Sequence, residues 1–357
     1  MCRMTIQDEL QRILEKLKED ENMKVRVALF GQPGSGKSSI INRLIGKKVA
    51  PTGQKTDTTL AEKPYEWNGL LLVDLPGYGT AQFPKETYFD EFELDSFDLF
   101  LCVFSGKIMQ ADHDFFQDLK KSGKLCIFVR NKRDEIWEEG RDITELEAEI
   151  VSDVRKQIQS EDNEIIFTSC RDSYGFDVLQ QKIYENLEPA KKIKWAKGVK
   201  AYSAQFLEEK KDACSKYVYI AAGSAAANAL NPIPGADIAV DAAVLVSLFA
   251  SIRTSYGLTE EKIKAVEVMM PAVAPLAYNI IHHATKKGIM LLLKKFIGRQ
   301  TLKQISKYIP FVGQAIAASA GFGITLAAGM AYLDDCHRLS EELLKKEILS
   351  PDQKKLE

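Results

Sequence analysis

The chain has almost no net charge and lacks several patterns that would mark common protein classes. Its 48 basic and 50 acidic residues leave a formal net charge of −2, which argues against a nucleic-acid-binding protein. The six cysteines show no paired metal-binding spacing, and the four histidines form no ligand pattern along the sequence. No apolar signal core stands near residue 1, and Cys2 occupies the position where N-myristoylation requires glycine.

Strand-like segments are missing from the second half of the chain. Residues 24–190 alternate short apolar runs with helical segments, which is typical of a parallel sheet. From about Lys191 the chain is rich in Ala, Gly, Leu and Lys with helical periodicity. We therefore predict an α/β domain at 23–190 and an all-helical domain at 191–357, with an N-terminal helix at 1–22 packing on the latter.

A glycine-rich segment between residues 31 and 38 is the most informative motif present. Gly31-Gln32-Pro33-Gly34-Ser35-Gly36-Lys37-Ser38 matches the phosphate-binding pattern G-x-x-x-x-G-K-[ST] and follows the apolar run at 25–30. Such a loop directs backbone N–H groups toward phosphate oxygens, and its lysine neutralises them. The segment predicts a P-loop nucleotide-binding domain with a Ras-like, mostly parallel sheet, in which Ser38 ligates Mg²⁺.

Three later motifs identify the nucleotide as GTP or GDP rather than an adenine nucleotide. Asp74-Leu75-Pro76-Gly77 follows an apolar run, as a Mg²⁺-holding aspartate and a γ-phosphate-binding glycine would. Asn131-Lys132-Arg133-Asp134 follows the apolar run at 125–129, and the Asp134 carboxylate suits the paired donors of guanine. Thr168-Ser169-Cys170 comes last and would support the base. The predicted nucleotide-binding residues are Gly34, Ser35, Gly36, Lys37, Ser38, Ser39, Asp74, Gly77, Asn131, Lys132, Asp134, Ser169 and Cys170.

The group that activates the attacking water is not evident from the motifs. Residues 51–59 read as a polar loop with four threonines, and we expect Thr59 to ligate Mg²⁺ together with Ser38 and Asp74. No glutamine follows Gly77, because Tyr78 stands there. This absence predicts slow intrinsic hydrolysis, or a catalytic group from the loop or from a second molecule. The candidate catalytic residues are Lys37, Thr59 and Asp57, with a plain solvated acid as the alternative for Asp57.

Acidic residues are absent between Val268 and Leu333, where seven basic residues occur between positions 286 and 307. A basic amphipathic helix of this kind lies on anionic lipid, or else is a solvated face that meets the acidic α/β domain. The run from Phe311 to Leu333 carries no charge and is long enough to span a bilayer. Its Ala, Gly, Ser and Thr content favours a buried helix or hairpin instead.

Taken together, the motifs resemble the immunity-related (interferon-inducible) GTPase family. The resemblance rests on four groups of residues in the α/β domain and on two features of the helical domain. They are Gly31–Ser39; Thr52-Gly53 with Thr59 and Pro64-Tyr65; Asp74–Gly79; Phe128–Asp134; Pro232–Asp237; and the Gly/Ala-rich run before Asp334. The retained Lys37 resembles the effector type of the family, and Asp57 stands where the family carries a switch acid implicated in catalysis.

The resemblance implies GTP hydrolysis with GTP-dependent dimers or oligomers in the manner of dynamins, at intracellular membranes and in cell-autonomous defence. A GTPase motif set also implies a reducing compartment, so we expect a cytoplasmic protein with peripheral membrane contact through residues 286–307. Two alternatives remain: a bacterial Era-like GTPase switch with a helical membrane-associated domain, and a GTP-locked scaffold.

Overall fold

The structure is a computed structural model and describes residues 23–51, 63–160, 163–228, 237–296 and 320–349. These residues form two compact units that divide after Tyr202. The first unit contains the sheet, and the second contains only helices among its described residues.

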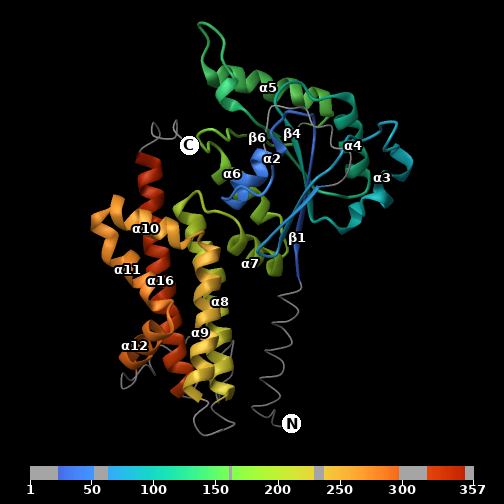
Figure 1. Cartoon of the computed structure of the whole chain (residues 1–357). Coiled ribbons are helices and arrows are strands. Elements are labelled where there is room, and N and C mark those ends of the chain that lie inside the picture. Colours follow the sequence, from blue (N-terminus) through green and yellow to red (C-terminus); the bar gives the residue numbers. More distant parts are fainter. Residues whose placement is uncertain (1–22, 52–62, 161–162, 229–236, 297–319, 350–357) are drawn as a thin grey trace. The chain divides into compact units, whose positions relative to one another are not determined.

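A six-stranded sheet forms the centre of the first unit, in the order β2-β3-β1-β4-β5-β6 (Figure 1). Strand β2 is antiparallel to β3, and every other neighbouring pair is parallel. The predicted α/β fold with a mostly parallel sheet is therefore confirmed. The strands are β1 (Val25–Phe30), β2 (Lys63–Trp67), β3 (Leu70–Asp74), β4 (Leu99–Phe104), β5 (Cys126–Arg130) and β6 (Ile165–Phe167).

Helices cover the sheet on both faces, which explains why the central strands are apolar along nearly their whole length. Alternate residues of β1, such as Ala28 and Phe30, point into a core that also contains Phe100, Phe115 and Phe128. Helix α4 packs on β5 and α5, whereas α2 and α7 pack on β3. The helices are α2 (Lys37–Ile45), α3 (Lys85–Glu91), α4 (Gln110–Lys121), α5 (Ile143–Ile158), α6 (Phe176–Glu185) and α7 (Pro189–Gly198), with short 3-10 turns at Leu94–Ser96 and Arg133–Glu135.

Helix α7 belongs to the first unit, although the predicted domain boundary at 190/191 falls inside it. Trp195 is fully buried, and its indole N–H donates to the Gln180 carbonyl at 3.1 Å. A Cβ on Gly198 would lie 2.6 Å from the Leu70 side chain, so the end of α7 packs directly on β3. The lysine-rich composition of this segment suggested the helical domain, but Trp195 bonds to α6 and Gly198 packs on β3, which places the segment in the first unit.

The second unit is built around three long helices that pack side by side, α8, α9 and α16 (Figure 1). The rings of Phe249 on α9 and Tyr332 on α16 stack at a centroid distance of 3.8 Å. A Cβ on Gly329 would lie 2.4 Å from Val218, so α16 approaches α8 closely there. The helices are α8 (Ala204–Asn228), α9 (Asp237–Ser255), α10 (Glu260–Met269), α11 (Ala274–His283), α12 (Lys286–Phe296) and α16 (Ala320–Leu349), with a 3-10 turn at Pro271–Val273.

The uncharged run predicted to be a buried helix lies partly in α16. Phe322, Leu326, Tyr332 and Leu333 are all buried within this helix, as a core helix requires, while residues 311–319 lie outside the described residues. None of the described helices is by itself long and apolar enough to cross a bilayer. Helix α10 and the following segment Pro271–His283, bent by 119° relative to each other, pass this test together on length and composition alone. The predicted N-terminal helix at 1–22 also lies outside the described residues.

Candidate functional site

The loops that follow β1, β3, β5 and β6 meet at the carboxyl edge of the sheet, where ligands of open α/β sheets bind. The loop after β1 needs glycine at two of its positions. Gly31 has φ +126°, and a Cβ there would lie 2.0 Å from the Val103 carbonyl oxygen. Gly36 has φ +96°, and its Cβ would lie 2.2 Å from Asn131 Nδ2. Both positions therefore exclude a side chain, which keeps the backbone open to a phosphate.

Lys37 begins helix α2 and is buried beside the carboxylate of Asp74. Its Nζ donates to the carbonyl oxygens of Gly31 at 2.8 Å and Gln32 at 3.2 Å, and lies 3.7 Å from Asp74 Oδ1. Those two carbonyls hold the ammonium over the loop, where β- and γ-phosphate oxygens would replace them as partners. Ser38 follows at the next position of the helix.

Asp74 is a buried carboxylate whose properties suit the binding of a cation. Burial raises its pKa, and the nearby Lys37 and Lys63 oppose this rise. Its buried Oδ1 accepts no hydrogen bond from any residue in the described ranges. Carboxylate and hydroxyl oxygens are the ligands that Mg²⁺ takes in nucleotide sites, so Asp74 and Ser38 fit this ion.

The Asn131 side chain links three of the loops. Its Nδ2 donates to the Ser35 carbonyl at 2.8 Å, while its Oδ1 accepts from Thr168 Oγ1 at 3.1 Å and Cys170 Sγ at 3.6 Å. We predicted Asn131 as a nucleotide contact from its motif, and its part in joining the loops was missed. No pattern in the sequence indicates this role, because Ser35, Thr168 and Cys170 lie far from Asn131 along the chain.

The loop after β5 presents Asp134 at the edge of the site. Lys132 has φ +60°, a left-handed conformation that turns the chain before Asp134. Arg133 is anchored behind it by Glu147 and by the Tyr174 ring, whose centroid is 3.9 Å from the guanidinium. Only the exposed Arg171 contacts the Asp134 carboxylate, at 3.6 Å, among the ion pairs of the described residues. Asp134 is therefore held in place with its acceptor oxygens available to a base.

The backbone after Thr168 completes this edge. The Thr168 N–H donates to the Arg130 carbonyl at 2.9 Å, and the Ser169 N–H donates to the Tyr174 carbonyl at 3.1 Å. These bonds hold Ser169 and Cys170 at this edge, and the Cys170 side chain contacts Asn131 there. The structure thus brings the phosphate loop, Asp74, Asn131, Lys132, Asp134, Ser169 and Cys170 to one edge, whereas Thr59 and Asp57 lie outside the described residues.

Tyr78, the residue that stands in place of a water-orienting glutamine, is packed into the protein. Its hydroxyl donates to Asp118 Oδ2 at 2.7 Å, and its ring stacks on Phe115 at a centroid distance of 4.6 Å. Burial and this carboxylate both raise the Tyr78 pKa. A neutral phenol held by Asp118 cannot serve as a base for water at neutral pH.

Replacing Tyr78 with phenylalanine is expected to cost about 1 kcal/mol of stability, the usual net value of one hydrogen bond. We expect GTP turnover to stay within about twofold of the wild type, because the hydroxyl is occupied by Asp118. Denaturant unfolding and steady-state turnover check the two parts. A loss of turnover by tenfold or more at unchanged stability would show that the hydroxyl acts in the reaction.

Asp112, in the first turn of α4, is a largely buried carboxylate that interacts electrostatically with the Lys37 ammonium. Burial raises its pKa to about 6, and Lys37 opposes this rise. Its buried Oδ2 accepts no hydrogen bond from the described part of the chain. Between the unfolded pKa near 4 and the folded value the native state binds more protons, so ionisation of Asp112 lowers stability as the pH rises.

Asp112→Asn is therefore expected to stabilise the nucleotide-free protein by on the order of 1–3 kcal/mol at pH 7, with the gain disappearing below about pH 4. Urea unfolding followed by tryptophan fluorescence measures this, because all three tryptophans lie in the first unit. Asp114→Asn is the control for which the opposite sign is expected, a loss of stability at pH 7. Hydrogen bonds from Lys85 and Gln110 lower the pKa of Asp114 to about 2. If the stability of the wild type and of Asp112→Asn changed equally with pH, the raised pKa of Asp112 would be contradicted.

Comparison with known proteins assigns the chain to a family. Residues 1–287 match the model of the interferon-inducible GTPase family. The chain is 24% identical over 277 residues to the T-cell-specific guanine nucleotide triphosphate-binding protein 2 of Mus musculus, covering 71% of this chain and 66% of the relative. It is 22% identical over 368 residues to the interferon-gamma-inducible GTPase 10 of Mus musculus, covering 97% of this chain and 87% of the relative.

Among solved structures, a probable GTP-binding protein EngB is similar over 45% of this chain and 98% of its own, at 23% identity and a TM-score of 0.35. Era of Aquifex aeolicus bound to GDP·AlF4⁻ is similar over 57% of this chain and 68% of its own, at 22% identity and a TM-score of 0.37. The family assignment rests on the sequence match and not on these structures. Because that match covers well over half of its residues, the chain belongs to the interferon-inducible GTPase family.

Proposed function

We propose that the chain binds GTP at the edge of the sheet described above and hydrolyses it to GDP and phosphate. The observation that carries this proposal is the Asn131 side chain, which joins the phosphate loop at Ser35 to the loop at Thr168 and Cys170. This link sets the distance between the loop that would hold the phosphates and the carboxylate of Asp134 that would read guanine. An adenine nucleotide offers no pair of donors to that carboxylate.

The residues of the site have separate roles in this proposal. Lys37 neutralises charge on the β- and γ-phosphate oxygens as it develops during transfer. Ser38 and Asp74 would hold Mg²⁺, with Thr59 from the loop outside the described residues, and the ion supplies further charge neutralisation when bound. The Gly77 N–H meets the γ-phosphate. The Asp134 carboxylate accepts hydrogen bonds from guanine and orients the nucleotide.

The site lacks a residue that orients the attacking water among those described. Tyr78 is bound to Asp118, so the missing group comes from the loop containing Asp57 and Thr59 or from a second copy of the chain. We therefore propose that GTP-dependent self-assembly stimulates hydrolysis. Turnover per chain should then rise with protein concentration, from the slow rate of an isolated molecule.

Turnover measured over a hundredfold range of protein concentration tests the assembly proposal, with sedimentation in GTP and in GDP run alongside. A rise in turnover per chain together with GTP-dependent association supports it. Flat, slow turnover with intact GTP binding would instead favour the scaffold alternative, and the fixed position of Tyr78 is the observation that keeps this alternative open.

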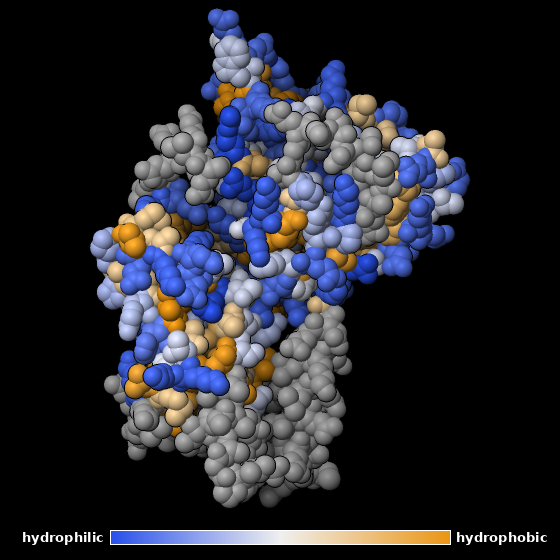
Figure 2. Space-filling model, viewed as in Figure 1, coloured by the Kyte–Doolittle hydropathy of each residue, from blue (hydrophilic) through white to orange (hydrophobic). Residues whose placement is uncertain are grey.

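We further propose that the second unit makes peripheral contact with anionic intracellular membranes, in a cytoplasmic protein that acts in cell-autonomous defence. Lys287, Leu291 and Lys295 are exposed and four residues apart, so they share one face of α12. Exposed apolar side chains of α10 and α11, which include Val268, Met269 and Tyr278, add to this unit's surface. Figure 2 shows apolar surface among hydrophilic side chains in the region of these helices.

Sedimentation with vesicles tests the membrane contact. Each lysine near an anionic surface contributes about 1 kcal/mol, so Lys287→Glu/Lys295→Glu should weaken binding to phosphatidylserine vesicles by at least tenfold. Lys120→Glu/Lys156→Glu, in the first unit, makes the same change in net charge and should bind normally. Equal binding of both double variants, or equal binding to neutral phosphatidylcholine vesicles, would rule out this face of α12 as the contact.

A further inference from the structure

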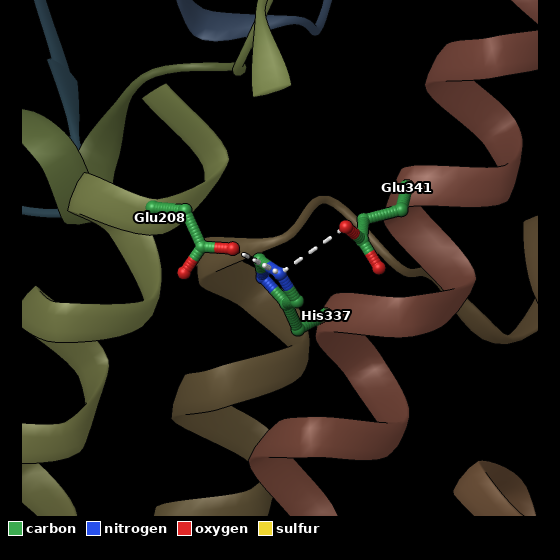
Figure 3. A group of neighbouring side chains, drawn as sticks. All are labelled: Glu208, His337 and Glu341. Atoms are coloured by element: carbon green, nitrogen blue, oxygen red, sulfur yellow. Dashed lines mark ion pairs between the residues drawn. The ribbon is translucent and has the colours of Figure 1, made fainter. Parts of the chain in front are cut away.

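Three side chains of the second unit converge, and none of them belongs to the predicted nucleotide-binding residues. Glu208 comes from α8, and His337 and Glu341 come from successive turns of α16 (Figure 3). His337 Nε2 lies 3.2 Å from Glu208 Oε1 and 3.7 Å from Glu341 Oε1. The histidines show no ligand spacing along the sequence, so this cluster appears only when the two helices are packed together.

The two distances from His337 Nε2 suit a small divalent ion, and all three ligand atoms lie within 4.8 Å of one another. Ligands bound to a tetrahedral Zn²⁺ at about 2.0–2.2 Å lie roughly 3.4 Å from one another. The two nitrogen–oxygen distances of 3.2 and 3.7 Å fall on either side of this value. His337 and Glu341 are four residues apart on one helix face, the spacing with which a single helix supplies two zinc ligands.

The other ring nitrogen of His337 has a partner that would orient it. Its Nδ1 lies 3.4 Å from the Tyr256 hydroxyl, in the segment that follows α9. When this hydroxyl accepts the Nδ1 proton, the Nε2 lone pair faces two carboxylates. Metal-binding histidines have such a partner on the second nitrogen as a rule. The arrangement leaves a position that calls for positive charge, either a proton on Nε2 or a metal ion.

The surrounding charges and exposure favour the metal ion. The nearby Lys211 ammonium is paired with Asp334 at 2.8 Å rather than placed between the two glutamates. The His337 side chain is only 4% exposed, whereas the side chains of Glu208 and Glu341 are 63% and 37% exposed. An ion could therefore enter from solvent, keep a water as its fourth ligand, and still meet a buried imidazole. Two carboxylates would balance its double charge.

We propose that Glu208, His337 and Glu341 form a binding site for a divalent transition-metal ion, Zn²⁺ foremost, which joins α8 to α16. None of its residues belongs to the proposed nucleotide chemistry, and a bound ion would add to the side-chain contacts that hold α8 against α16. Nitrogen and oxygen ligands of this kind suit Zn²⁺, and a site with one open position exchanges its water readily.

Calorimetric titration of the EDTA-treated full chain with Zn²⁺ tests the proposal, with saturating Mg²⁺ and GDP present to occupy the nucleotide site. We expect one Zn²⁺ per chain and a rise in melting temperature on binding. Glu208→Gln/Glu341→Gln should weaken binding at least a hundredfold and abolish the melting shift. Asp212→Asn/Glu342→Gln is the matched control, because it removes one carboxylate from each of the same helices and should bind normally.

Two further measurements distinguish the loss of a metal ligand from a folding defect. Tyr256→Phe keeps the ring packing and is expected to weaken Zn²⁺ binding about tenfold, as loss of an outer-shell partner does. Titration with Co²⁺ reports the ligands directly. Absorption from thiolate-to-metal charge transfer would assign the ion to cysteines and overturn the proposal. Equal Zn²⁺ binding by the wild type and Glu208→Gln/Glu341→Gln would also overturn it, and so would no binding by the wild type.

Discussion

Replacing Asp134 with asparagine is expected to lower GTP affinity by about 100- to 1,000-fold and to create affinity for xanthosine triphosphate. The carboxylate accepts hydrogen bonds from two guanine donors, and bonds to a charged group contribute about 1.5–3 kcal/mol each. An asparagine amide offers one acceptor and one donor, which matches the carbonyl that xanthine carries in place of the guanine amine. The change in nucleotide preference separates a lost base contact from general damage to the site.

Competition binding with labelled GDP measures this prediction, with GTP and xanthosine triphosphate as competitors. Arg171→Ala is the control, because it removes the only ion-pair partner found for Asp134 among the described residues and leaves the carboxylate itself. Its preference should stay with GTP. An Asp134→Asn protein that keeps wild-type GTP affinity would show that the carboxylate does not read the base.

The second large effect is expected from Lys37→Ala, which should lower GTP turnover by at least 100- to 1,000-fold. Lys37 is the buried cation of the phosphate loop, and its removal leaves the developing negative charge on the phosphates without this partner. GTP affinity should fall as well, because the same ammonium contacts the bound triphosphate.

Phosphate release under saturating Mg²⁺ checks this variant, and Lys47→Ala is its control because Lys47 is exposed just beyond the end of α2. The Lys37 ammonium also bonds two loop carbonyls, so an unfolding curve must accompany the assay. A folded Lys37→Ala protein with turnover near the wild-type rate would place the reaction elsewhere in the chain.

The sequence predicted the sheet correctly, and the structure brings the predicted site residues together where a motif directly follows an apolar strand. The phosphate loop, Asp74 and Asp134 each stand at such a strand end, and parallel strands bring these ends to one edge. The helical segments expected between the strands of residues 24–190 include α5 and α6. Local pattern is sufficient for these features because backbone direction and side-chain period determine them.

Features that depend on contacts between distant segments were not predictable in the same way. The lysine-rich segment of α7 has the composition of the helical domain, yet its contacts with β1, β3 and α6 assign it to the first unit. The inward position of Tyr78, in the turn after β3, depends on Asp118 from α4, and the cluster at His337 depends on Glu208 from α8. No spacing in the sequence reports such pairs, since each forms only through packing.

The most direct test of the central claim is the turnover of GTP and ATP by the wild-type chain, measured side by side at equal nucleotide and Mg²⁺ concentrations. The site described here predicts GTP hydrolysis with ATP turnover at least a hundredfold lower, because only guanine satisfies the Asp134 carboxylate. Equal turnover of the two nucleotides, or no hydrolysis of GTP at any protein concentration, would contradict the assignment of this edge of the sheet as a GTPase site.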